Sequence, residues 1–290
     1  MRPWRIICAP FQCGCDRDGG QLAPEYLLRL GIRTTVGDAH WFCRPLLPQE
    51  GAAEYGVRNY AQIVDMCAKL REEVAAWRAK KERVLILGGD HAIALGSIAG
   101  VHECNPNVGV IWFDAHGDVN TEATSPSANA HGMPVAALMG LCQSGLNDII
   151  KVQLKPQNVF WIGARDLDEG EVETIERLGI MDNVYSTERV HEIGMDAVMK
   201  DIKQKMEKQG VETVHLSFDI DGMDPSIVWA TGTRVENGLT QKDLDAFIEA
   251  LKSLPKMESM DFVEYNPLLD DEEHMTGKWC VDTMSRLMNN

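Results

Sequence analysis

Short apolar segments rich in valine and isoleucine alternate along the chain with longer segments whose apolar residues recur at helical spacing. Each short segment is typical of a strand that lies in the interior of a sheet. The predicted strands cover 5–10, 83–89, 108–116, 158–166, 211–221 and 257–267. Strands that alternate with helices in this way predict a parallel sheet with helices on both of its faces.

The longer segments predict the helices that cover this sheet. They lie at 24–31, 58–82, 91–100, 133–141, 169–179, 195–210, 240–254 and 278–288. The chain contains no linker, low-complexity segment or solenoid-type repeat between them. We therefore expect a single α/β/α domain that spans residues 1–290.

The chain is acidic, with a formal net charge of −16. An acidic surface repels nucleic acid and anionic membranes and attracts a cationic substrate. No apolar stretch approaches the roughly 20 residues that span a bilayer, and the N-terminus has too short an apolar run for a signal peptide. The eight cysteines follow no disulfide framework and are expected to be reduced. We expect a cytoplasmic protein without nucleic-acid or membrane partners.

Acidic residues and histidines stand where four of the predicted strands end. Ligands in open α/β sheets bind beyond the carboxyl ends of the strands, so these residues should gather at one edge of the sheet. A single such residue is usually a cap or a satisfied polar group, and the inference therefore depends on all of them together. They are Asp90, His91, Asp114, His116, Asp118, Asp219, Asp221, Asp224 and Glu264.

Two of these groups have the alternating spacing of strand side chains. Residues 114, 116 and 118 can converge on one side of the chain, as can residues 219 and 221. Carboxylates and imidazoles packed so densely repel one another unless divalent cations lie among them. Oxygen ligands with a few imidazoles suit Mn²⁺ better than the thiolate-rich sites of structural Zn²⁺, and six candidate ligands favour two ions over one.

Four motifs resemble the ureohydrolase family, which includes arginases and agmatinases, and the resemblance extends over essentially the whole chain. The motifs are "GGDH" at 88–91, "DAHGDVN" at 114–120, "SANAHGMP" at 127–134 and "SFDIDGMDP" at 217–225. They follow one another in the family's order. The resemblance implies a three-layer α/β/α fold with a mostly parallel sheet of about eight strands. It also implies two Mn²⁺ ions and a homo-oligomer, a trimer or a hexamer.

By the same resemblance, six residues would hold the two ions, and Asp114 and Asp219 would bridge them. One ion would be bound by His91, Asp114, Asp118 and Asp219, and the other by His116, Asp114, Asp219 and Asp221. A hydroxide shared by the ions would attack the guanidinium carbon of a small substrate, since metal ions lower the pKa of bound water toward neutrality.

The resemblance also implies the substrate contacts, because "DVNTEATSPSANAHG" and "ARDLDEGE" look like arginase rather than agmatinase. An α-carboxylate would be received by Asn120, Ser125 and Ser127, and an α-amino group would be held by Asp168 and Glu171. The guanidinium would pair with Glu264. Protons would be carried by His131 and given to the leaving amine by Asp118, and Thr233 would place a hydroxyl beside the site.

The leading hypothesis is a binuclear manganese hydrolase that converts L-arginine to L-ornithine and urea. Ala128 stands where arginases usually have glycine, and Trp229, Arg234 and Asn237 lie in an altered stretch. These departures leave open a related ureohydrolase acting on agmatine, another guanidino acid or formiminoglutamate. A non-catalytic metal-binding homologue would be expected to lack some of the six ligands, and all six are present in this sequence.

His215, like the other histidines outside the motifs, is expected at the surface or as a hydrogen-bonded core residue.

Overall fold

The computed structural model describes residues 4–32, 39–42 and 53–289. In this part of the chain, one sheet has the strand order β2-β1-β3-β8-β7-β4-β5-β6, and all of its pairings are parallel. The strands are β1 (Trp4–Ala9), β2 (Ala39–Trp41), β3 (Arg83–Gly88), β4 (Val108–Phe113), β5 (Val159–Ile162), β6 (Val184–Tyr185), β7 (Thr213–Asp219) and β8 (Met257–Val263). This architecture confirms the predicted three-layer parallel fold.

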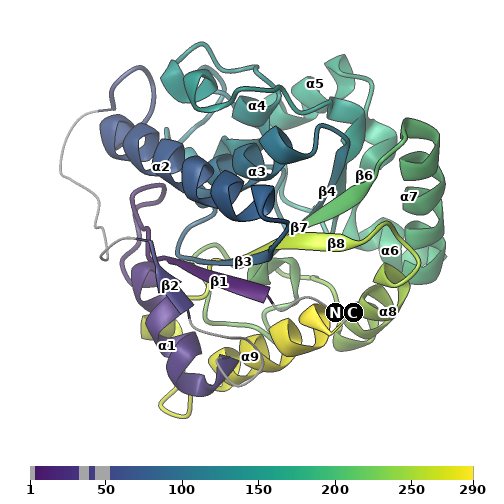
Figure 1. The fold of residues 1–290 in the computed structure, drawn as a ribbon. Coiled ribbons are helices and arrows are strands. Elements are labelled where there is room, and N and C mark those ends of the chain that lie inside the picture. The colour runs from purple at the N-terminus through teal and green to yellow at the C-terminus, as the bar shows by residue number, and fades with distance from the viewer. Residues whose placement is uncertain (1–3, 33–38, 43–52, 290) are drawn as a thin grey trace.

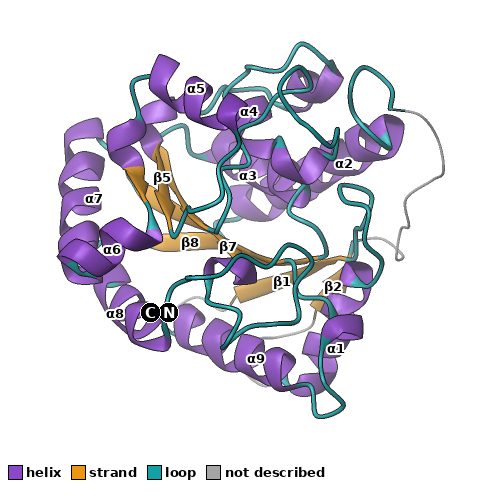
Figure 2. Ribbon diagram, turned by 180° about the vertical axis from the view of Figure 1, so that it is seen from behind, coloured by secondary structure: helices purple, strands orange, loops and turns teal. Residues whose placement is uncertain are grey.

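Helices pack on both faces of the sheet (Figures 1 and 2). Buried residues of α2, α3, α4 and α5 share one apolar cluster with one face, and those of α1, α6, α7, α8 and α9 share the other. The helices are α1 (Ala23–Leu30), α2 (Tyr60–Ala79), α3 (Ile93–Cys104), α4 (Pro134–Leu138), α5 (Glu169–Arg177), α6 (Thr187–Ile193), α7 (Met195–Gln209), α8 (Gln241–Leu251) and α9 (Met275–Met288).

Three elements were not predicted from the sequence. The edge strands β2 and β6 have only three and two residues, which is too short for a period-two pattern to appear. Helix α6 is also short, and Gly194, whose φ is 86°, separates it from α7. The six predicted strands are present, but each of the four that carry polar tails ends earlier than predicted. Those tails leave the sheet and form the loops of the candidate site.

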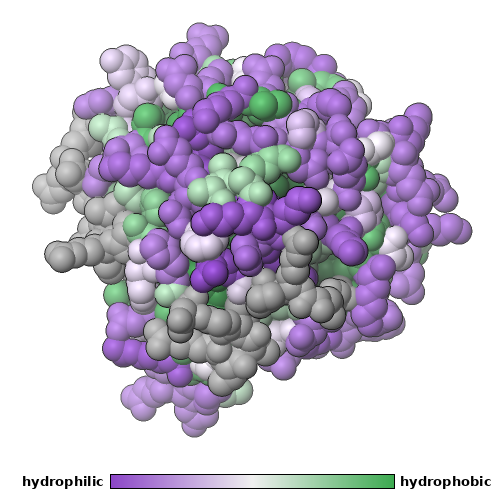
Figure 3. All heavy atoms as spheres, viewed as in Figure 1, coloured by the Kyte–Doolittle hydropathy of each residue, from purple (hydrophilic) through white to green (hydrophobic). Residues whose placement is uncertain are grey.

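The interior strands are buried on both faces, which explains their continuous apolar runs. All six residues of β4 are buried. On the α7 and α8 side, Phe218 of β7 stacks on Phe113 of β4 and Phe262 of β8, with ring centroids 4.4 and 5.1 Å apart. The face of the molecule seen in Figure 3 is largely hydrophilic. No helix in the described ranges is both long enough and apolar enough to cross a membrane.

The loop that follows β4 contains two strained backbone positions. Asp118 has φ 50° and Ala128 has φ 58°, in the left-handed region that side chains with a Cβ rarely adopt. The amide of Ala128 donates to Ser125 Oγ at 3.1 Å, and its carbonyl accepts from the amide of Arg58. These bonds hold the segment that carries Ser125 and Ser127, and the glycine expected by resemblance would adopt its backbone conformation without strain.

We expect Ala128→Gly to stabilise the protein. Removing the strain of a left-handed alanine stabilises the folded state by roughly 1–2 kcal/mol. The greater freedom of glycine stabilises the unfolded state by about 0.5–1 kcal/mol and so offsets part of this gain. The free energy of unfolding from urea titration should therefore rise by about 0.5–1 kcal/mol. The matched control is Ala123→Gly in the same loop, where φ is not positive, and this change should destabilise. A loss of stability in Ala128→Gly would contradict the strain.

Candidate metal centre

The candidate site lies where the carboxyl ends of four adjacent strands meet. Strands β3, β8, β7 and β4 are neighbours in the sheet, so the residues that follow them are brought together. His91 lies between β3 and α3, and Asp114 follows β4 directly. Asp219 ends β7 and Glu264 follows β8. The prediction that these segments converge at one edge is confirmed by the distances below.

Three aspartates surround one nitrogen of His91. Its Nδ1 lies 2.9 Å from Asp114 Oδ2, 3.1 Å from Asp118 Oδ2 and 3.2 Å from Asp219 Oδ2. All four side chains are buried. Ligand atoms of His91, Asp114 and Asp219 are close enough together to hold one metal ion.

A second group surrounds His116. Its Nδ1 lies 3.2 Å from Asp114 Oδ1 and 3.2 Å from Asp221 Oδ2, and these three residues form a second possible ligand set. Asp114 therefore presents one carboxylate oxygen to each group. Asp221 belongs to a 3₁₀ turn, η7 (Ile220–Gly222), and its amide donates to Asp219 Oδ1 at 2.8 Å.

The donor atoms fit metal ligation better than hydrogen bonding. His91 Nδ1 and Asp114 Oδ2 are buried and have no hydrogen-bond partner, although they lie 2.9 Å apart. His91 Nε2 lies 2.8 Å from Ser217 Oγ, and a proton on Nε2 would leave a lone pair on Nδ1. Lone pairs of nitrogen and oxygen that converge without hydrogen-bond geometry are the arrangement that a bound cation requires.

The electrostatics of the cluster show how much the aspartates depend on positive charge. Burial raises the pKa of Asp118 to about 6, and the charge of Asp114 adds to this. Burial, followed by the charges of Asp221 and Asp114, raises the pKa of Asp219 well above its usual range. Burial also raises the pKa of Asp114, but the close approach of His116 and His91, in their protonated forms, outweighs burial and lowers the pKa of that carboxyl. Divalent cations would supply the positive charge that protonated histidines otherwise provide.

A cavity of about 180 Å³ opens beside this cluster and is lined by all of the predicted substrate contacts. All eight predicted substrate and catalytic residues other than metal ligands line it, together with four of the six predicted ligands. The first set is Asn120, Ser125, Ser127, His131, Asp168, Glu171, Thr233 and Glu264. Neither Asp114 nor Asp221 is a lining residue.

Several lining residues are fixed by one another. Asn120 Nδ2 donates to Asp168 Oδ2 at 2.8 Å, and Thr233 Oγ1 donates to Asp221 Oδ2 at 3.0 Å. Glu171 accepts from the amides of Val119 and Asp168, each at 3.0 Å. Each oxygen of Glu171 keeps a second lone pair, so a ligand amine could share it.

His131 and Glu264 form a pair on the other side of the cavity. Glu264 Oε1 lies 3.6 Å from His131 Nδ1 and accepts from the amide of His91 at 2.8 Å. Burial lowers the pKa of His131, but the neighbouring Glu264 carboxylate more than offsets burial and raises the pKa to about 9. At neutral pH this environment keeps His131 protonated unless nearby cations oppose the charge of Glu264.

Two of the acidic residues predicted at this edge of the sheet, Asp90 and Asp224, have other roles. Asp90 accepts from the amides of Gly14 and Ala92, at 2.7 and 2.9 Å, and so joins the loop after β1 to the start of α3. Asp224 accepts from the amides of Ser226 and Gly238 within its own loop. Neither residue lines the cavity.

Three residues that depart from the family pattern also lie outside the cavity. Trp229 packs against the apolar cluster on the α7 and α8 side, and Arg234 and Asn237 are exposed. None of the three is a lining residue. The structure therefore gives these departures no direct contact with a bound substrate.

Sequence reasoning missed two residues that shape the site. Arg165 donates to the carbonyls of residues 163, 221, 222, 223, 235 and 236, and thereby ties down the loop that carries Thr233. A lone arginine in a loop gives no sequence signal of this role.

Asp166 lines the cavity and lies 3.9 Å from His116 Nε2. Its spacing of two from Asp168 was a signal that could have found it.

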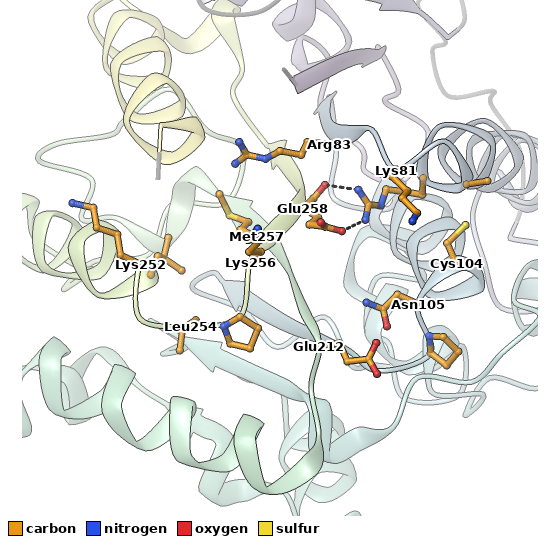
Figure 4. A pocket seen from close by; sticks show the side chains of 15 residues that line it. Lys81, Arg83, Cys104, Asn105, Glu212, Lys252, Leu254, Lys256, Met257 and Glu258 are labelled. Carbon is orange, nitrogen blue, oxygen red and sulfur yellow. Dashed lines mark hydrogen bonds and ion pairs between the residues drawn. The ribbon is translucent and has the colours of Figure 1, made fainter. Parts of the chain in front are cut away.

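A larger cavity, of about 850 Å³, lies at the opposite edge of the sheet, near the first residues of β3, β7 and β8 (Figure 4). Glu258 in its wall pairs with Arg78, and Arg83 lies over the ring of Trp4. Its walls contain neither aspartate nor histidine. The candidate site is therefore identified by its acidic residues and histidines and not by the size of its cavity.

The carboxyl of Glu171 makes a testable contribution to stability in the metal-free protein. Burial, with the charge of Asp118, raises its pKa from 4.5 to about 7. The folded state then holds a proton that the unfolded state has released, so stability falls as pH rises from about 4.5 to 7. Glu171→Gln should flatten this fall by up to about 1.4 kcal/mol per pH unit, measured by urea denaturation with a chelator. The exposed control Glu173→Gln should leave the slope unchanged, and an unchanged slope in Glu171→Gln would contradict the assignment.

Comparison with known proteins agrees with this geometry. The profile described as the arginase family matches residues 2–289. The arginase of Bacillus caldovelox is 37% identical over 297 aligned residues, which cover 99% of this chain and 98% of the relative. Its native structure superposes with a TM-score of 0.90 at 35% identity, covering 100% of this chain and 99% of that one. The Entamoeba histolytica arginase in complex with L-ornithine has a TM-score of 0.89 at 34% identity, with 99% and 98% coverage. The chain belongs to the arginase family.

Proposed function

We propose that this chain hydrolyses L-arginine to L-ornithine and urea at a pair of Mn²⁺ ions. The observation that carries the proposal is the cavity itself. It combines a histidine–aspartate cluster, a carboxylate suited to a guanidinium, and polar groups suited to an α-amino acid. Each end of an arginine molecule thus has a chemically matched partner within one cavity.

Six residues would hold the ions. The first set is His91, Asp114, Asp118 and Asp219, and the second is His116, Asp114, Asp219 and Asp221, with Asp114 and Asp219 shared. Oxygen-rich ligation with one imidazole per ion supports manganese over the zinc of thiolate sites. The chemistry that such ions supply is the activation of water as a nucleophile at neutral pH.

The protein side chains would orient the substrate. Glu264 presents a carboxylate to the planar guanidinium, and its position is fixed by the amide of His91. Asn120, Ser125 and Ser127 offer neutral donors to an α-carboxylate, whereas Asp168 and Glu171 offer acceptors to an α-amino group. Agmatine lacks the α-carboxylate and would leave the first set unused. The L-ornithine in the Entamoeba histolytica structure supports an amino-acid product.

Two groups would move protons. Asp118, which is buried beside His91 and lines the cavity, would give a proton to the departing amine. His131 holds a proton beside Glu264 and lines the cavity, so it can exchange protons between the site and solvent. Thr233 donates to Asp221 and would keep that carboxylate oriented.

The cellular setting is also part of the proposal. Five cysteines, Cys15, Cys67, Cys104, Cys142 and Cys280, are free thiols, which supports a reducing, cytoplasmic location. We further propose that the chain acts as one domain and assembles as a trimer or a hexamer. Light scattering on the purified protein would measure the number of subunits.

The substrate is tested by urea release from the Mn²⁺-loaded chain. We expect L-arginine to be cleaved far faster than agmatine or other guanidino compounds. Asn120→Ala should lower kcat/KM for arginine by about 10- to 100-fold, since a hydrogen bond to a charged group is worth about 1.5–3 kcal/mol, and should change agmatine cleavage little. The control Arg234→Ala, outside the cavity, should leave the substrate preference unchanged.

Other results of this assay would assign a different function to the chain. Good cleavage of agmatine, another guanidino acid or formiminoglutamate without cleavage of arginine would assign the chain to a sibling activity. Stoichiometric metal binding with no hydrolysis of any of these compounds would identify a non-catalytic homologue. An Asn120→Ala variant that loses both activities equally would contradict the proposed carboxylate contact.

A further inference from the structure

A column of polar side chains runs down one face of the sheet beneath the metal centre. On the face toward α2 and α3, β7 presents His215 and Ser217 and β8 presents Ser259 and Asp261, all of them at most 1% exposed. The two strands place His215 opposite Ser259 and Ser217 opposite Asp261. The flanking strands β3 and β4 contribute only apolar side chains to the same face.

Hydrogen bonds converge on one oxygen of Asp261. Its Oδ2 lies 2.6 Å from Ser97 Oγ of α3, 3.1 Å from His215 Nε2 and 3.5 Å from Ser217 Oγ. A carboxylate can only accept, so all three groups donate to it. The other nitrogen of His215, Nδ1, lies 2.9 Å from Ser259 Oγ.

This arrangement determines which nitrogen of His91 is free. Ser217 Oγ lies 2.8 Å from His91 Nε2 and 3.5 Å from Asp261 Oδ2, so it can accept from the imidazole while its own hydroxyl donates to the carboxylate. A proton on Nε2 leaves the lone pair on Nδ1, the atom that faces Asp114, Asp118 and Asp219. Trp112 stacks on the His91 ring, with centroids 4.1 Å apart and planes 7° apart, and so fixes its plane.

Burying these polar side chains costs folding free energy, so a contribution to stability does not explain why they are present. Asp261 is fully buried, its Oδ1 has no hydrogen-bond partner, and its Oδ2 lies 3.1 Å from Nε2 of the equally buried His215. Replacing buried polar pairs by apolar residues of similar volume is often neutral or stabilising, and the adjacent strands are apolar at this depth. The presence of these polar side chains at this depth therefore points to a role in the candidate metal centre next to them.

We propose that Asp261, with His215, is a positioning group for the metal ion that binds at His91. Asp261 orients the hydroxyl of Ser217, Ser217 fixes the tautomer of His91, and His91 presents Nδ1 to the ion. The inference rests on the proposed metal centre. Outer groups that orient a ligating histidine typically change metal affinity by about 10- to 100-fold when they are removed.

The test is a Mn²⁺ binding isotherm, measured by equilibrium dialysis and metal analysis, on the full chain. Asp261→Leu removes the acceptor and frees the Ser217 proton to turn toward His91. We expect one ion to bind with the affinity of the parent chain and the other to bind about 10- to 100-fold more weakly. Asp261→Asn keeps an accepting oxygen and should recover part of the lost affinity.

The matched control is Asn158→Leu, a buried Asx-to-Leu change in which the lost partner is the carbonyl of Val108. It should lower the melting temperature and leave both affinities unchanged. Should Asp261→Leu fail to fold, Ser97→Ala removes the 2.6 Å bond and is expected to weaken one ion several-fold.

Two outcomes separate this inference from the proposed function. A parent chain that binds two ions, with Asp261→Leu binding both equally tightly despite a lower melting temperature, would overturn the positioning role alone; unchanged affinities in Ser97→Ala would do the same. A parent chain that binds fewer than two ions would contradict the metal centre and this inference together.

Discussion

Mutual repulsion among buried carboxylates is the constraint on which this structure depends. Asp114, Asp118, Asp219 and Asp221 are buried at the same edge of the sheet, with His91 and His116 between them. Burial alone raises the free energy of each ionised carboxylate, and neighbouring negative charges add to that cost. The cluster is therefore stable only with positive charge at its centre, and the unpartnered Nδ1 of His91 shows where that charge would be bound.

The sheet meets this constraint by its strand order. Strands β3, β8, β7 and β4 are distant in the chain but adjacent in space, so their carboxyl ends bring separate acidic segments within ligand distance. The apolar cores on both faces hold these ends in place. The same topology places most of the predicted substrate contacts on loops. The segments 120–131 and 166–171 follow β4 and β5 and contribute residues to the wall of the cavity.

The gathering of acidic segments was predictable because each follows an apolar strand, and the carboxyl ends of neighbouring parallel strands meet at one edge of the sheet. The strand alternation expected for residues 114–118 and 219–221 is absent, since β4 ends at Phe113 and β7 at Asp219, and the loops bring these side chains together instead. The contacts of Arg165 were not predictable, since one guanidinium reaches six carbonyls that the fold alone brings near. The Asp261 column was hidden for a similar reason. Its members lie on α3, β7 and β8, and only the register between strands shows that they touch.

Anomalous scattering from Mn²⁺-loaded crystals would show directly whether two divalent ions occupy this cluster. We expect two peaks about 3.5–4 Å apart, one beside His91 Nδ1 and the other beside His116 Nδ1, with Asp114 between them. A single peak, or two peaks that leave either histidine unligated, would contradict it.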